Sequence, residues 1–113
     1  MKGLIIKPKW ADLILDGEKT IEVRGNNTKI RGAIGIIKSG SKKVFGTVDL
    51  FNCIPLDMEK FELWKDRHKL NITYGEVLKI YPQPYAWCLR KANKYNVPVV
   101  YEHKQGCVIW VNI

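Results

Sequence analysis

Apolar and polar residues alternate with two different periods along the chain, and the changes of period mark the expected elements. An apolar run at residues 3–7 predicts a short strand. Pro8 follows it, and because proline has a fixed φ and no backbone donor, it suits the first turn of a helix. That helix carries three apolar residues at helical spacing, Trp10, Leu13 and Ile14. Gly17 lies just past them, where a left-handed cap would end the helix.

The charged segment, GEKTIEVR at residues 17–24, changes to a period of two and predicts a strand that begins directly after the helix cap. Its two faces would carry Thr20, Glu22 and Arg24 on one side and Lys19, Ile21 and Val23 on the other. So much charge in a strand has two interpretations. It is either the solvated face of a half-buried strand or a set of charges placed for a ligand.

The rest of the chain predicts more strands than helices. The expected strands are a hairpin of 32–38 and 42–54 after a turn at 25–28, then 85–94, 97–101 and a last strand at 106–113. Two helices are expected, one at 57–68 with Asp57 as its cap and one at 73–80 that begins with a Thr73–Glu76 capping box. Gly32, Gly35 and Gly46 fall inside strands, where glycine marks bends. We therefore expect an α+β fold, a small mixed β-barrel of five to six strands with two to three peripheral helices, as a single domain over residues 1–113.

Charge and composition narrow the class of partner. The net charge is +8, and no acidic residue occurs between Glu22 and Asp49, an interval with six lysines and arginines. This balance suits a polyanion such as RNA, although it also suits solubility alone. No apolar run approaches the ~18–20 residues of a membrane helix, so we expect a cytoplasmic protein without a membrane partner. Three widely spaced cysteines predict buried, reduced thiols.

The run PKWADLILDGEKTIEVR resembles the G-x-K-x-x-E-x-R signature of the ASCH domain family, whose relatives include the PUA-like barrels that bind RNA. A YAW segment at 85–87 and a G-x-x-x-W pattern at 106–110 extend the similarity over nearly the whole chain. The resemblance implies a β-barrel with a cleft beside the motif. In this family the cleft is thought to hold RNA or a nucleotide-like ligand.

Three motif residues are the main candidates for the site. Lys19 would present a compact charge to a phosphate or a carbonyl, unless it is a solvated lysine. Glu22 and Arg24 are two residues apart, ~6.6 Å along a strand, and together offer a ligand an acceptor and a donor fork. The competing interpretation of this pair is a structural ion pair.

Other candidates come from the aromatic and basic residues. We expect Tyr85 to contact a base by stacking, and Trp87 and Trp110 to be buried. Lys42 and Lys43 are expected to contact phosphates. His68 and His103 have no companions at metal-ligand or nucleophile spacing. We therefore predict no metal and no cofactor.

Two functions fit these residues. The first is an RNA-binding or nucleotide-binding module. The alternative, implied by the family resemblance, is a small amidohydrolase that deacylates a modified nucleoside such as N4-acetylcytidine, or a nuclease. In the amidohydrolase Lys19 would be the polar activator and Glu22 or Glu76 the general base. Those deacylases carry a hydroxyl residue at the position of Glu22, and Thr20 shares the face of that position. Binding is therefore the first prediction.

Overall fold

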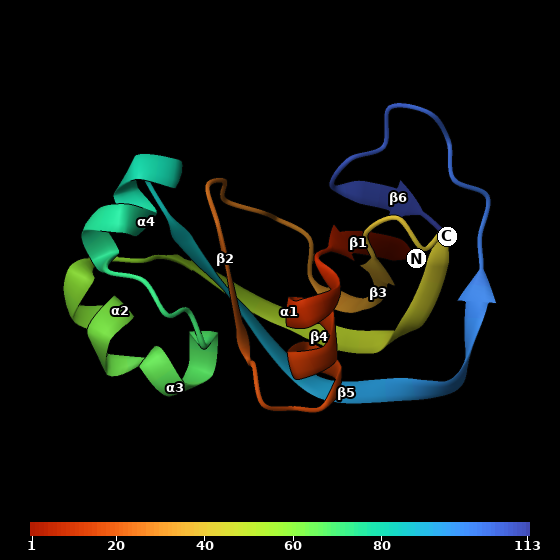
Figure 1. Ribbon diagram of the computed structural model, residues 1–113, viewed down its shortest axis with the longest axis horizontal. Helices are drawn as coiled ribbons and strands as arrows, with labels where there is room; N and C mark the ends of the chain where they lie inside the picture. Colours follow the sequence, from red (N-terminus) through yellow and green to blue (C-terminus); the bar gives the residue numbers. More distant parts are fainter.

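The computed structural model describes residues 1–113, and the order of its elements follows the hydrophobic pattern (Figure 1). The strands are β1 (Lys2–Ile6), β2 (Ile21–Arg24), β3 (Gly32–Lys38), β4 (Lys43–Pro55), β5 (Tyr85–Val100) and β6 (Trp110–Asn112). The helices are α1 (Pro8–Leu15), α2 (Met58–Leu63), α3 (Lys65–His68) and α4 (Tyr74–Ile80). None of the helices is long and apolar enough to cross a membrane.

All six strands form one mixed sheet, in the order β2-β5-β4-β3-β1-β6. β1 and β3 run parallel, and the other neighbours are antiparallel. The sheet curls into a half-barrel with α1 packed on it, and α2, α3 and α4 gather at one end of the molecule (Figure 1). The expected α+β fold with a small mixed β-barrel of five to six strands is therefore confirmed as a six-stranded half-barrel, with four short helices instead of two to three.

Side chains join the two edges of the half-barrel. Arg24 on edge strand β2 donates from Nη2 to the Ile5 carbonyl of β1, 3.2 Å away. Trp87 of β5 stacks on Trp110 of edge strand β6, with ring centroids 5.6 Å apart and planes 11° from parallel. These contacts place the end of the charged segment next to the opposite edge of the sheet.

The strong curvature is concentrated in β4 and β5, the two longest strands. Their pairing shifts register at three places, and Lys91 in β5 has a φ of +56°. A Cβ atom at Gly46 would lie 2.4 Å from the Asn93 carbonyl oxygen, so β5 can approach β4 this closely only where β4 has a glycine. The separately predicted strands at 85–94 and 97–101 are one continuous strand, β5.

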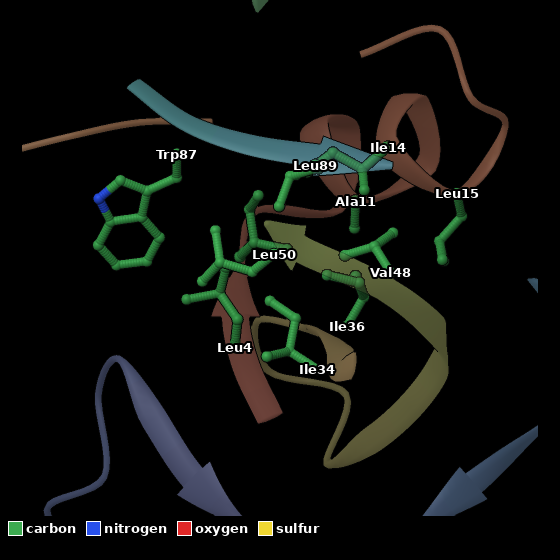
Figure 2. Packing of buried hydrophobic residues seen from close by; sticks show 11 residues of the cluster. Leu4, Ala11, Ile14, Leu15, Ile34, Ile36, Val48, Leu50, Trp87 and Leu89 are labelled. Carbon is green, nitrogen blue, oxygen red and sulfur yellow. The ribbon is translucent and has the colours of Figure 1, made fainter. Parts of the chain in front are cut away.

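The main core lies between the sheet and α1 (Figure 2). Its fully buried side chains include Leu4, Ala11, Ile14, Ile34, Ile36 and Leu50. Burial of each large side chain contributes ~1.5–3 kcal/mol to stability. This packing fixes α1, and with it the start of the charged segment.

A second core covers the other side of β2. Ile21 and Val23 pack with Phe61 of α2, Val77 of α4 and Ala86 of β5. Because Glu22 between them is also buried, β2 is enclosed on both faces. The interpretation of this strand as half-solvated is therefore wrong.

The helix expected over 57–68 is two helices, α2 and α3, separated at Trp64. Trp64 has a φ of −103° and a ψ of 23°, outside the α-helical range. The Arg67 amide donates to the Trp64 carbonyl, a bond between residues three apart instead of the four of an α-helix. The break allows His68 to stack on Phe61 with ring centroids 4.3 Å apart. This tertiary contact leaves no trace in the local hydrophobic period.

The predicted helix caps are confirmed. The Asp57 carboxylate accepts from the Lys60 amide at 2.8 Å. Thr73 and Glu76 form a reciprocal capping box with distances of 3.1 Å at the start of α4. Gly17 follows α1 with a φ of +81°. These local signals therefore predict where the helices begin and end.

Two expectations about burial need correction. Trp87 is buried as predicted, but Trp110 is only half-buried, because it lies on edge strand β6. The cysteines are reduced but half-buried instead of buried. Cys53 lies at the margin of the main core, and Cys107 lies in the irregular segment before β6.

Candidate functional site

The end of α1 sets the position of the charged segment. Gly17 turns the chain, and the amides of Glu18 and Lys19 both donate to the Leu13 carbonyl at 3.0 Å. The regular strand begins only at Ile21. The expected two-residue alternation therefore does not include Lys19, which still belongs to the helix cap.

Lys19 is almost completely buried, with 1% of its surface exposed. Its ammonium donates to the His68 carbonyl, lies 3.7 Å from Glu22 Oε1 and is 4.7 Å from the centre of the Trp10 ring. Burial lowers the pKa of Lys19 to about 8, although the neighbouring Glu22 carboxylate favours the charged form. The interpretation of Lys19 as a solvated side chain is therefore wrong.

Glu22 links Lys19 to Arg24. Its Oε2 atom accepts from Arg24 Nε at 2.9 Å, while Oε1 faces Lys19. Because Arg24 Nη2 is held by the Ile5 carbonyl and Nη1 has no acceptor within the protein, the guanidinium is fixed but keeps donors for a ligand. Its side chain is 18% exposed and lies 5.7 Å from the centre of the Trp87 ring.

Glu22 and Arg24 line a cavity of about 410 Å³, which we call the motif cavity. Trp10 of α1 and Tyr81, which follows α4, contribute aromatic surface, and most of the remaining lining is apolar. The cavity therefore combines a held ion pair with aromatic and aliphatic walls. Such a combination suits a flat, polar-edged ligand.

A second cavity of about 430 Å³, the tryptophan cavity, adjoins the first. The two share Arg24 and Tyr81, and the second adds Trp87 and Trp110. The Trp87 indole donates to the Asn26 carbonyl at 2.9 Å, which fixes the ring. We refer to the two cavities together as the groove, with Arg24 at their junction.

The three motif residues do not line a single cavity. Glu22 and Arg24 line the groove, whereas Lys19 lies behind Glu22 and Trp10 and borders a different, smaller cavity next to Thr20. Lys19 therefore affects the groove through its charge and through Glu22. Nothing in this geometry presents its ammonium to a molecule in the groove.

The other candidates are spread over the surface. Tyr85 is half-buried against the main core and lines neither cavity of the groove. Lys42 lines a third cavity, and Lys43 is exposed at the start of β4. The carboxylate of Glu76 is occupied by its capping box and is exposed, which does not suit a general base in a dry cleft.

Four aromatic residues line the groove but were not among the predicted site residues: Trp10, Tyr81, Trp87 and Trp110. Tyr81 packs against Gly25, where an added Cβ would lie 2.5 Å from the ring atom Cδ1. The glycine directly after the motif was therefore the one sequence signal for this contact. Its partner, Tyr81, is far away in the sequence, so the contact itself could not be predicted. Trp10 has the spacing of a core residue of α1, so only the fold reveals that it borders the cavity.

His68 has a structural role. Its Nε2 lies 2.8 Å from the Phe61 carbonyl, and Nδ1 accepts from the Leu70 amide at 3.0 Å. Burial lowers its pKa, which keeps the ring neutral, as the bond from the Leu70 amide to Nδ1 requires. No group of three or more His, Cys, Asp or Glu side chains is arranged to hold a metal ion.

Comparison with known proteins identifies the family. A family model for the ASCH domain matches residues 4–104, so the chain belongs to the ASCH domain family. This confirms the resemblance based on the charged segment. No curated protein matches the sequence.

Solved structures of an ASCH protein from Zymomonas mobilis have the same fold. One has a TM-score of 0.70 at 18% identity and covers 88% of this chain and 72% of that chain. A serine-to-alanine mutant of the same protein gives a TM-score of 0.76 at 16% identity, covering 99% of this chain and 87% of that chain. At this identity the likeness shows the fold alone.

Proposed function

We propose that this ASCH domain binds single-stranded RNA or a nucleotide, with the base in the groove. The observation that carries the proposal is the position of Arg24 at the junction of two cavities, held by Glu22 and the Ile5 carbonyl with Nη1 free. A fixed guanidinium with unused donors can hydrogen-bond to a base edge or a phosphate.

The aromatic surroundings support a base as the ligand. Tyr81 and Trp10 border the motif cavity, and Trp110 is half-buried in the tryptophan cavity. Stacking of an unpaired base on one aromatic side chain contributes ~1–3 kcal/mol. Glu22 faces the same cavity and can accept a hydrogen bond from an exocyclic amino group. Tyr81 thus takes the stacking role that we assigned to Tyr85 from the sequence.

The net charge of +8 supports a phosphate-bearing ligand. Lys42 and Lys43 form no ion pair within the protein, so both are available to phosphates. Binding of a single strand releases counterions, so the affinity should fall as the salt concentration rises. In a plot of log affinity against log salt concentration, we expect a slope of about −0.7 for each phosphate neutralised.

The test is fluorescence anisotropy with short single-stranded RNA over a range of salt concentrations. We expect a steep salt slope, and replacement of both Lys42 and Lys43 by Gln should reduce the slope by about one to two units. Replacement of Lys60 and Lys65, which are paired with Asp57 and Glu62, is the matched control and should leave the slope unchanged. A flat salt response of the wild type would contradict the proposal.

A hydrolase is the second candidate, favoured by one observation. The lowered pKa of Lys19, about 8, and the Glu22 carboxylate beside it are features of acid–base catalysis. The burial of the ammonium against the His68 carbonyl favours binding without turnover. Chromatography of N4-acetylcytidine and of RNA after incubation with the protein tests this candidate. Deacylation or cleavage by the wild type that is lost in samples of Glu22→Gln shown to be folded would support the hydrolase over the binding module.

A further inference from the structure

A third cavity, of about 350 Å³, lies outside the groove but adjoins it. It shares Ile5, Ser39 and Val108 with the motif cavity. The β3–β4 turn forms one wall, and the segment that follows β5 forms the other. The Tyr101 amide donates to the Lys42 carbonyl at 3.3 Å, which holds the two walls together.

The turn presents a cation and free backbone donors. Gly40 and Lys42 have φ values of +82° and +56°, and their amides have no acceptor within the protein. The intervening Ser41 amide and the following Lys43 amide are satisfied by the Lys38 carbonyl and Ser41 Oγ. Alternating left-handed residues in a turn direct free amides toward an anion.

The opposite wall contributes His103. Tyr101 Oη lies 2.8 Å from His103 Nδ1, and burial raises the pKa of the Tyr101 phenol, so the phenol keeps the proton that it can donate to Nδ1. A neutral imidazole whose Nδ1 accepts carries its proton on Nε2 and can donate from there. Lys42 and Cys107 are the other titratable residues of this cavity, and no carboxylate lines it.

We propose that this third cavity is a phosphate subsite, in which Lys42, His103 and the free amides of the turn hold the phosphate of a nucleotide. The assignment rests on the proposed function, because the base of the same nucleotide would occupy the adjoining motif cavity. Lys43 follows Lys42 in the chain but lines neither this cavity nor the groove, so it has no part in the subsite.

Calorimetric titration of nucleosides, their 5′- and 3′-monophosphates and inorganic phosphate tests this subsite. We expect one monophosphate to bind at least about tenfold more tightly than its nucleoside, since a hydrogen bond to a charged group is worth that much. Lys42→Gln should remove this advantage and leave nucleoside affinity unchanged. Lys65→Gln makes the same charge change at an exposed, ion-paired lysine outside this cavity and the groove, and it should keep the advantage.

Equal affinity for nucleoside and monophosphate, or equal losses in Lys42→Gln and Lys65→Gln, would overturn the subsite. Inorganic phosphate that binds as tightly as the monophosphate would overturn the link to a nucleotide. If no nucleoside or nucleotide binds, the proposed function has failed. The subsite is then tested separately, by measuring ¹⁵N amide chemical shifts as inorganic phosphate is added. Saturable shifts of Gly40 and Lys42 that are lost in Lys42→Gln would support an anion site, and their absence would overturn it.

Discussion

The two ends of the charged segment face different environments. At its start, Lys19 is sealed between Trp10, Glu22 and the His68 carbonyl. At its end, Arg24 lies at the junction of two cavities and keeps a free donor. A single motif thus contains a buried charge that the fold encloses and a partly exposed charge that faces a ligand site.

Glu22 connects these two ends because each of its oxygens faces a different cation. The comparison shows that a family motif need not consist of ligand contacts only. Burial separates the two roles here, since Lys19 is 1% exposed and the Arg24 side chain is 18% exposed. Substitutions at the start of the segment should therefore change stability, and substitutions at its end should change affinity.

Glu22→Gln should have the largest effect on stability. The substitution leaves the buried Lys19 ammonium without a carboxylate and weakens the hold on Arg24, so we expect a loss of ~3–5 kcal/mol in the free energy of unfolding. Urea denaturation measures this loss. Glu18→Gln changes an exposed carboxylate of the same segment and should stay within ~0.5 kcal/mol. Similar midpoints for the two variants would show that Glu22 is not a buried partner.

The pH dependence of stability should reveal the buried Lys19. The unfolded chain keeps the lysine proton up to its ordinary pKa of 10.5, whereas the folded protein loses it near 8. Between these values the unfolded state binds more protons, so raising the pH favours the folded state. We expect wild type to gain up to ~3 kcal/mol relative to Lys19→Met between pH 7 and pH 10.5.

Urea denaturation of both proteins at the two pH values measures this difference. Lys19→Met keeps the aliphatic stem and removes the titrating group, so effects of other lysines and tyrosines cancel. A difference between the two proteins that does not change with pH would mean that Lys19 titrates normally and is hydrated.

Much of this fold is predictable from the sequence because its signals are local. The glycine cap of α1, the Asp57 cap and the Thr73–Glu76 capping box each depend on neighbouring residues. The two-residue spacing of Glu22 and Arg24 likewise predicts their pairing.

The features that were missed depend on contacts distant in the sequence. Lys19 is buried against the carbonyl of His68, which is 49 residues away in the sequence. His68 lies at the end of α3, and the hydrophobic period does not separate α3 from α2. Tyr81 lines the groove because Gly25 leaves room for its ring. Neither the hydrophobic period nor the spacing of residues along the chain predicts either of these contacts.

Gly25→Ala tests the open end of the segment through Tyr81. The new Cβ would lie 2.5 Å from the Tyr81 ring, so the ring must move, at a cost of ~1–3 kcal/mol. We expect weaker RNA binding in anisotropy assays as well as a lower melting temperature. Gly75→Ala in α4 is the control, since its Cβ meets nothing closer than 3.8 Å, and it should be neutral or stabilising by ~0.5–1 kcal/mol. Unchanged binding in folded Gly25→Ala would separate Tyr81 from the ligand site.

The affinity of Arg24→Gln for single-stranded RNA tests the central claim most directly. Arg90→Gln is the matched control, because Arg90 is an exposed, ion-paired arginine outside the groove. Anisotropy and urea denaturation should be measured on the same samples. We predict that Arg24→Gln lowers affinity at least about tenfold, with a loss of ~1–3 kcal/mol in unfolding free energy that is smaller than the loss in Glu22→Gln, whereas Arg90→Gln leaves affinity within about twofold. Equal affinities of folded Arg24→Gln and Arg90→Gln would contradict the assignment of the ligand to the Arg24 end of the segment.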